Sequence, residues 1–243
     1  MEKITQKDID WLLNLDDEIK SGPSPSSPKN KSKRYGLRIS VALFIIIGLV
    51  LLPFFLLIRT SVFLNVYYNL NAWVALTAGV IATVVLLSIY LLLFFRKFPN
   101  KKLVFKVGLA ASGILVFTYC MYGLLYLSSV NAKSDEIRNV YRSMHPILRV
   151  AVATTTLADG ELVITDISRN PEDYTSMGLP VNQRSLHFPQ PESGYVHAID
   201  LRTIGRSEFR NLLIQFSLEI MGFYTLRHTG TADHLHISIP RSG

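Results

Sequence analysis

Residues 37–58 read LRISVALFIIIGLVLLPFFLLI, an apolar run of the length that an α-helix needs to cross a bilayer. Two further runs of this kind follow at residues 72–95 and 107–128. No acidic residue interrupts any of them. The sequence therefore predicts a three-helix transmembrane region over residues 36–129, and the lipid bilayer is the first expected partner.

The basic residues flank these runs unevenly. They are concentrated before the first run and between the second and third, whereas the link between the first two runs carries only Arg59. Cytoplasmic loops of membrane proteins carry an excess of Lys and Arg. We therefore expect a multi-pass protein of the cytoplasmic (inner) membrane, with a cytoplasmic N-terminus and everything after about residue 130 outside. This bias accounts for the net charge of +7, and no aromatic-rich basic groove indicates nucleic acid as a partner.

The segment before the first run has two parts. Residues 1–20 are expected to form a cytoplasmic amphipathic helix that begins at Thr5, with Asp8 at the capping-box position. This helix lies on the inner membrane face or docks a cytoplasmic partner, and the sequence leaves both open. Residues 21–35 are rich in Ser, Pro, Lys and Asn, which predicts a disordered basic linker. The single cysteine, Cys120, lies in the third run, which excludes an intrachain disulfide and a cysteine-based metal site.

Residues 130–243 have the size of one small domain. Apolar spacing predicts helices at 130–149, 170–178 and 206–221, and alternating patterns predict strands at 162–167, 195–201, 223–227 and 234–239. This order is typical of a small α+β domain with a mostly antiparallel sheet.

The polar residues of this domain are gathered near two of the predicted strands. In the last strand His234 and His236 share one face, and in the strand before residue 202 the side chain of Asp200 points away from that of His197. An ion reached by Asp200 could thus be reached by His236 and by a loop histidine such as His187. Two imidazoles and a carboxylate can hold zinc and leave a fourth position open.

The region from Asp159 to Ser238 resembles the zinc D-Ala-D-Ala carboxypeptidase family (VanY-type peptidases), which belongs to a wider group with the hedgehog signalling domain. Ser185-Leu186-His187 matches the family's Ser-x-His, and Ala198-Ile199-Asp200 matches its Ala-x-Asp. Asp233-His234-Leu235-His236 matches its acid-x-x-His. The chain departs from the pattern by an insertion, Phe188 to Ser193, between the first two elements.

The resemblance implies a role for each matching residue. His187, Asp200 and His236 would be the zinc ligands, and Asp233 would be the general base that takes a proton from the attacking water. Arg169, at the end of a strand and before a short helix, would hold the substrate carbonyl and stabilise the developing oxyanion. Substrate binding would fall to two further residues, Ser185 and His234.

The expected function is that of a membrane-anchored zinc metallopeptidase that hydrolyses peptidoglycan stem peptides next to D-amino acids in the cell wall. Carboxypeptidase and endopeptidase action both remain open. The alternative is a catalytically inactive zinc-binding or cell-wall-sensing module on a membrane anchor. A third reading is a structural membrane protein whose outer domain holds no metal.

Overall fold

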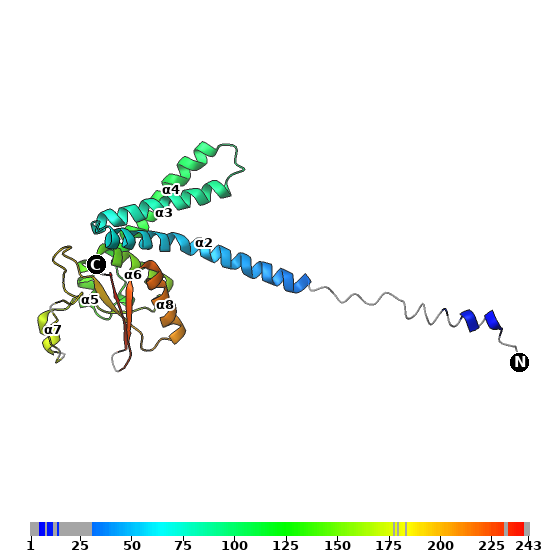
Figure 1. Ribbon diagram of the computed structural model, residues 1–243. Helices are drawn as coiled ribbons and strands as arrows, with labels where there is room; N and C mark the ends of the chain where they lie inside the picture. The colour runs from blue at the N-terminus through cyan, green and yellow to red at the C-terminus, as the bar shows by residue number, and fades with distance from the viewer. Residues whose placement is uncertain are drawn as a thin grey trace. The chain divides into compact units, whose positions relative to one another are not determined.

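Three long helices account for the apolar part of the chain in the computed structural model (Figure 1): α2 (Lys31–Tyr67), α3 (Ala72–Phe94) and α4 (Lys101–Leu125). Each is long and apolar enough to cross a membrane, so the three predicted apolar helices are confirmed. Helix α2 has 37 residues and rises about 55 Å, which exceeds the thickness of a hydrocarbon core. The helix begins before residue 37 and ends after residue 58, so it extends beyond the predicted run at both ends.

The structure describes residues 5–7, 9–11, 14, 31–176, 178, 180–182, 184–230 and 233–240. Most of the predicted helix over 1–20 and of the predicted linker over 21–35 lies outside these residues. Residues 31–35 belong to α2, so the linker prediction is wrong for that stretch, where the helix continues into its basic flank. The chain divides into two compact units, residues 1–49 and 50–243, and the contacts below lie within the second.

Small residues let the spans approach closely. An ideal Cβ on Gly79 of α3 would lie 2.5 Å from the carbonyl oxygen of Leu57 in α2 and closer still to the hydroxyl of Ser61. The backbones can meet there only because residue 79 has no side chain, which is the usual way that membrane helices associate.

The remaining chain forms a small α+β domain. After three short turns, η1 (Ser129–Asn131), α5 (Asp135–Asn139) and η2 (Tyr141–Ser143), come α6 (Pro146–Ala158), β1 (Ile164–Asp166), α7 (Pro171–Ser176), β2 (Ala198–Arg202), α8 (Glu208–Met221), β3 (Tyr224–His228) and β4 (His234–Ser238). The strands lie in the order β1-β2-β4-β3, and every pair is antiparallel. The predicted antiparallel sheet is thus confirmed.

The helix predicted over residues 130–149 is wrong. The chain there makes short turns, and α6 starts at Pro146 and runs to Ala158. His145 has φ −54° and ψ 133°, the extended conformation that a following proline favours. Proline suits the first position of a helix, because that position's N–H has no partner within the helix.

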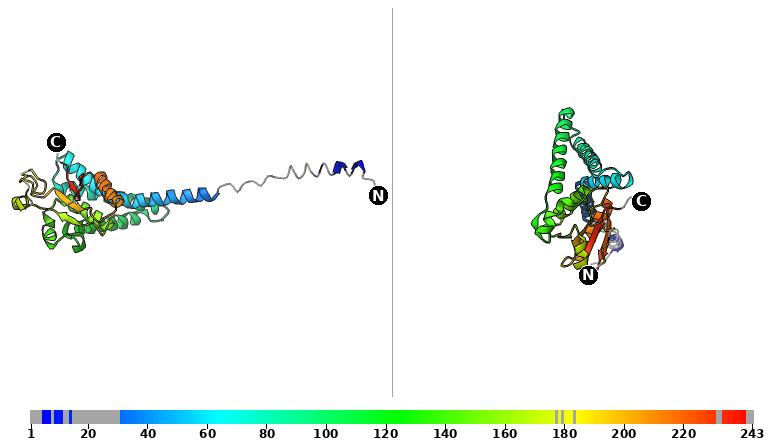
Figure 2. Two further views of the ribbon diagram at one scale, coloured as in Figure 1. Left: turned by 90° about the horizontal axis from the view of Figure 1, so that it is seen from below. Right: turned by 90° about the vertical axis from the view of Figure 1, so that its left-hand side faces the viewer.

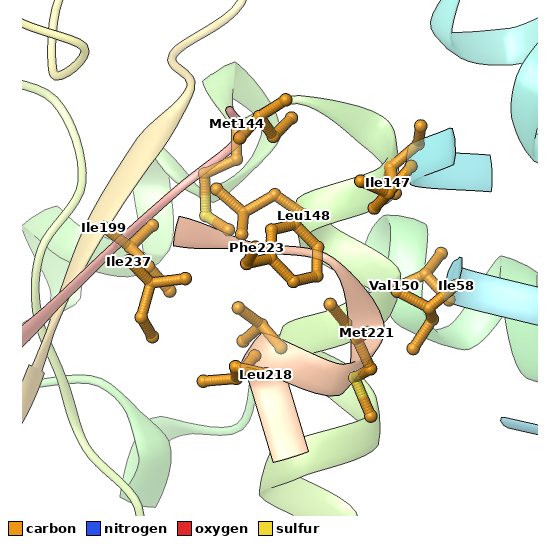
Figure 3. Packing of buried hydrophobic residues seen from close by; sticks show 14 of the residues in the cluster. Ile58, Met144, Ile147, Leu148, Val150, Ile199, Leu218, Met221, Phe223 and Ile237 are labelled. Carbon is orange, nitrogen blue, oxygen red and sulfur yellow. The ribbon is translucent and has the colours of Figure 1, made fainter. Parts of the chain in front are cut away.

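One face of the sheet carries the core. Ile199 of β2 and Ile237 of β4 are fully buried and meet Leu148 of α6 and Leu218 of α8 (Figure 3). Helix α8, which is orange in Figure 2, also packs on β3 and α6. Because strand side chains alternate, the polar residues of β2 and β4 lie on the opposite face, which these helices leave free.

Helix α6 joins the domain to the spans. It packs against α3 and α4. Arg149, a residue that is 5% exposed, donates from its guanidinium to the Leu124 carbonyl oxygen at 2.7 Å. The hydroxyl of Tyr141 donates to the Gly123 carbonyl oxygen at 2.6 Å. These bonds satisfy carbonyl groups at the C-terminal end of α4, which have no partner within that helix. The domain and the ends of the spans are therefore one packed body.

Candidate metal centre

Strand register brings two of the predicted ligands together. Asp200 of β2 and His236 of β4 are direct partners in the antiparallel ladder, on the sheet face away from α6 and α8. His187, from the segment between α7 and β2, lies beside both of them. One donor atom from each of the three residues lies within 4.8 Å of the others. The structure thus brings together the three residues that the sequence predicted as metal ligands, in an arrangement that could hold a metal ion.

The spacing of the three donors fits a small tetrahedral ion. The Nε2 atom of His187 is 3.3 Å from Nδ1 of His236 and 3.5 Å from Oδ1 of Asp200, and the third edge, from His236 to Asp200, is 2.9 Å. Zinc bonds of about 2.0–2.1 Å at tetrahedral angles place neighbouring donors about 3.3 Å apart. The three donor–donor distances are therefore close to those of a tetrahedral zinc site.

A backbone carbonyl fixes the orientation of His187. Its Nδ1 lies 2.9 Å from the carbonyl oxygen of Ile167, and it donates its proton there because a carbonyl can only accept. Its other nitrogen, Nε2, lies 3.5 Å from Oδ1 of Asp200 and 3.3 Å from Nδ1 of His236, on the side where a metal ion would bind. A histidine that ligates a metal through one nitrogen and bonds a carbonyl through the other is the usual arrangement. At 3% exposure, His187 is held away from bulk water.

Asp200 is buried and ionised. Burial alone would raise the pKa of its carboxyl, but the contacts with the His187 and His236 rings outweigh burial and hold the pKa well below its usual range. The outer oxygen, Oδ2, accepts from the Arg169 guanidinium at 2.7 Å. Arg169 also pairs with Asp166. It therefore orients a candidate ligand, a contact different from the substrate carbonyl that the resemblance implies for it.

The insertion between His187 and Asp200 closes on itself. The Gln190 amide donates to the carbonyl oxygens of Ser185 and Phe188 at 3.1 and 2.8 Å, and Ser193 Oγ lies 2.7 Å from Nε2 of His197. Short loops of this kind are inexpensive in chain entropy. The extra residues are taken up in the loop, so His187 still reaches Asp200.

Asp233, the predicted base, lies at the rim of the same cavity. Its carboxylate accepts from the Arg227 guanidinium at 2.6 and 2.9 Å and from the Thr203 hydroxyl at 2.7 Å. The Arg227 bond and then the Thr203 bond lower the pKa of Asp233 to about 2. The carboxylate is therefore charged at neutral pH and is a weak base in this arrangement.

The two residues predicted to bind substrate also line the cavity. Ser185 is largely buried, and its hydroxyl oxygen accepts a hydrogen bond from the Tyr174 hydroxyl at 2.7 Å. This bond holds the Ser185 side chain in the wall of the cavity. Nε2 of His234 is 3.8 Å from Oδ2 of Asp200, and its ring stacks on that of His228 at 4.7 Å. His234 is accordingly a neighbour of the three-donor centre.

The cavity above the centre has a volume of about 840 Å³, enough for a small peptide fragment. Its wall carries four basic side chains: Lys133, Arg169, Arg184 and Arg202. Reasoning from sequence did not identify Thr203, Arg227, Tyr174 or Ile167 as part of this site. Thr203 and Ile167 contact residues that lie 30 and 20 positions away in the sequence, whereas Arg227 and Asp233 are only six residues apart.

Comparisons of the chain with protein-family models, with curated proteins and with solved structures give no match. The functional assignment therefore rests on the residues of the site.

Proposed function

We propose that the protein is a membrane-anchored zinc-dependent peptidase that hydrolyses peptidoglycan stem peptides next to D-amino acids. The observation that carries this proposal is the triangle of donor atoms on His187, Asp200 and His236, with edges close to those of a tetrahedral zinc site. The resemblance of the surrounding motifs to the D-Ala-D-Ala carboxypeptidase family supports the reaction type.

The donor set favours zinc among common cations. Two imidazole nitrogens and one carboxylate oxygen form a three-ligand set used in catalytic zinc sites, whereas calcium and magnesium prefer oxygen ligands alone. Bound zinc would supply Lewis acidity and lower the pKa of a water to about 7. His187 and His236 would present neutral nitrogens to it, and Asp200 would contribute the charge.

The other residues would prepare the reaction. Arg169 would keep the Asp200 carboxylate in place through its bond to Oδ2. Asp233 would accept the proton of the attacking water and pass it to the leaving amine, once a bound substrate loosens its pairing with Arg227. Lys133, Arg184 and Arg202 on the cavity wall, which also carries three carboxylates, would attract a peptide that ends in a carboxylate.

The topology supports the substrate class. The excess of Lys and Arg beside α2 and between α3 and α4 favours a cytoplasmic location for those segments. An odd number of spans would then put the C-terminal domain on the outer side of the cytoplasmic membrane, where peptidoglycan lies.

The proposal is tested with the full chain in detergent, loaded with zinc and incubated with a pentapeptide that ends in D-Ala-D-Ala. We expect release of D-alanine, and we expect Asp233→Asn to lose it while still binding zinc. Asp135→Asn is the matched control, because the Asp135 side chain is 84% exposed and pairs only with Arg138 among its described contacts. If zinc-loaded protein releases nothing from this peptide or from cross-linked wall fragments, the proposed catalysis is excluded.

A second candidate is a zinc-containing module that binds wall peptides without turnover. The bonds from Arg227 and Thr203 that hold the pKa of Asp233 at about 2 favour it, because a carboxylate of that pKa is a poor proton acceptor. Binding of the pentapeptide, measured by calorimetry and unaffected by Asp233→Asn, with no product formed would support this candidate over the enzyme.

A further inference from the structure

Helix α8 has apolar side chains on two opposite faces. Its inner face, with Ile214, Leu218 and Met221, is buried in the core. Five large apolar side chains remain exposed on the other face: Phe209 (69%), Leu212 (59%), Leu213 (47%), Phe216 (60%) and Ile220 (45%). Their spacing of three and four residues aligns them along one side of the helix. We refer to these five residues as the outer stripe.

The outer stripe is narrow and bounded by polar residues. Glu208, Gln215 and Glu219 follow one edge of α8, and Arg210 and Ser217 follow the other. The core of the domain does not use this second row of Phe and Leu side chains, which remains an exposed apolar surface. Exposed apolar patches usually mark a contact with a membrane or a protein. Its neighbours indicate which of these two partners covers it.

The edge of α8 beside the stripe lies against α2. Leu213 and Ser217 line a cavity of about 540 Å³ together with Leu51, Phe54 and Phe55 of α2. At the other end of α8, an ideal Cβ on Gly222 would lie 3.0 Å from a methyl carbon of Val62. Leu213, Ser217 and Gly222 thus place one edge of α8 and its C-terminal end beside residues 51–62 of α2.

That part of α2 belongs to a candidate membrane span. Leu51 and Leu52 are each 45% exposed, and within the span they would face acyl chains. Through Leu213, the outer stripe therefore adjoins an apolar surface of α2 that a bilayer would cover.

We propose that α8 is an interfacial membrane helix whose outer stripe inserts among the acyl chains of the leaflet next to the domain. An amphipathic helix with Phe and Leu on one face buries that face at the boundary of headgroups and acyl chains. The domain would then be held against the bilayer by α8 as well as by its spans. This contact is independent of metal binding and of peptide hydrolysis.

Spin labelling of the full chain in phosphatidylcholine nanodiscs tests this proposal. The only native cysteine is removed as Cys120→Ser, and a nitroxide is attached in turn at Phe216→Cys and Leu212→Cys. Val85→Cys on α3, where the side chain is 51% exposed, is the lipid-facing standard, and Glu172→Cys on α7 is the solvent-facing standard. Frequent collision of the nitroxide with oxygen indicates that the label lies in lipid. Frequent collision with a water-soluble nickel chelate indicates that the label lies in water.

Because the headgroup boundary is shallower than the middle of a span, we expect the oxygen-to-nickel collision ratio at Phe216 and Leu212 to lie below that at Val85 and several-fold above that at Glu172. A ratio equal to that at Glu172 would place the stripe in water and overturn the proposal. Exclusion of both reagents would show that protein covers the stripe, a second copy or another partner, and would equally overturn it. Zinc content, measured on the same samples, bears on the metal centre alone, so the two proposals fail separately.

Discussion

Removal of one imidazole from the three-donor centre should abolish stabilisation by zinc. A ligand that binds only the folded protein, at a free concentration one hundred times its Kd, raises the free energy of unfolding by about 2.7 kcal/mol. For a body the size of residues 50–243, each kcal/mol shifts Tm by about 2–4 °C, so zinc should raise Tm by roughly 5–11 °C. In His236→Ala only the His187–Asp200 edge of 3.5 Å remains.

If the loss of this donor weakens binding by roughly a thousandfold, the same free zinc stabilises the variant by less than about 0.1 kcal/mol. The assay is thermal unfolding of the full chain in detergent, followed by near-UV circular dichroism with and without zinc after chelation. His228→Ala is the control, since it removes a ring that stacks on His234 but is not one of the three donors. An equal zinc-induced rise in Tm for His236→Ala and the wild type would refute the reasoning.

Three further predictions concern other parts of the molecule. Burial lowers the pKa of His145 from 6.5 to about 3. The contribution of the neutral ring to stability is therefore full above pH 6.5 and is lost as the pH falls toward 3, by about 2 kcal/mol at pH 5. His145→Phe removes this contribution and should flatten the dependence of Tm on pH between 7 and 5. Gly79→Val should destabilise the packing of α2 and α3 by about 1–3 kcal/mol, whereas Gly113→Val, with open space around its Cβ, should leave Tm unchanged; equal values for the two variants would contradict the packing described. Arg227→Met removes the main cause of the low pKa of Asp233, so the acidic limb of any hydrolysis should move from about pH 2 toward 3.8, and a limb that stays in place would exclude Asp233 as the base.

Periodicity in the sequence predicted most of the domain. The alternation in residues 234–239 and 195–201 predicted β4 and β2, and helical spacing with Gly222 at its end predicted α8. The same alternation predicted that Asp200 and His236 could reach one ion, because a strand fixes which side chains share a face. The ladder pairs these two residues directly.

Contacts between distant segments were beyond the reach of such patterns. Periodicity favoured one helix over residues 130–149 and gave no indication that α6 packs between the spans and the sheet, although Pro146 marks where α6 begins. The carbonyl of Ile167 that orients His187 comes from 20 residues earlier in the sequence. Arg227 and Asp233 are only six residues apart, but the strand pattern did not indicate that their side chains pair. The sequence could not identify the outer stripe of α8 either, because two faces of this helix are apolar and only the structure shows which of them is buried.

The most direct test of the metal centre is X-ray absorption at the zinc edge on the purified full chain, with the zinc content measured on the same sample. We predict one zinc per chain with only nitrogen and oxygen ligands at about 2.0–2.1 Å, and loss of this signal in Asp200→Ala. A wild-type chain that takes up no zinc, or an Asp200→Ala chain with an unchanged spectrum, would contradict a metal centre built from His187, Asp200 and His236.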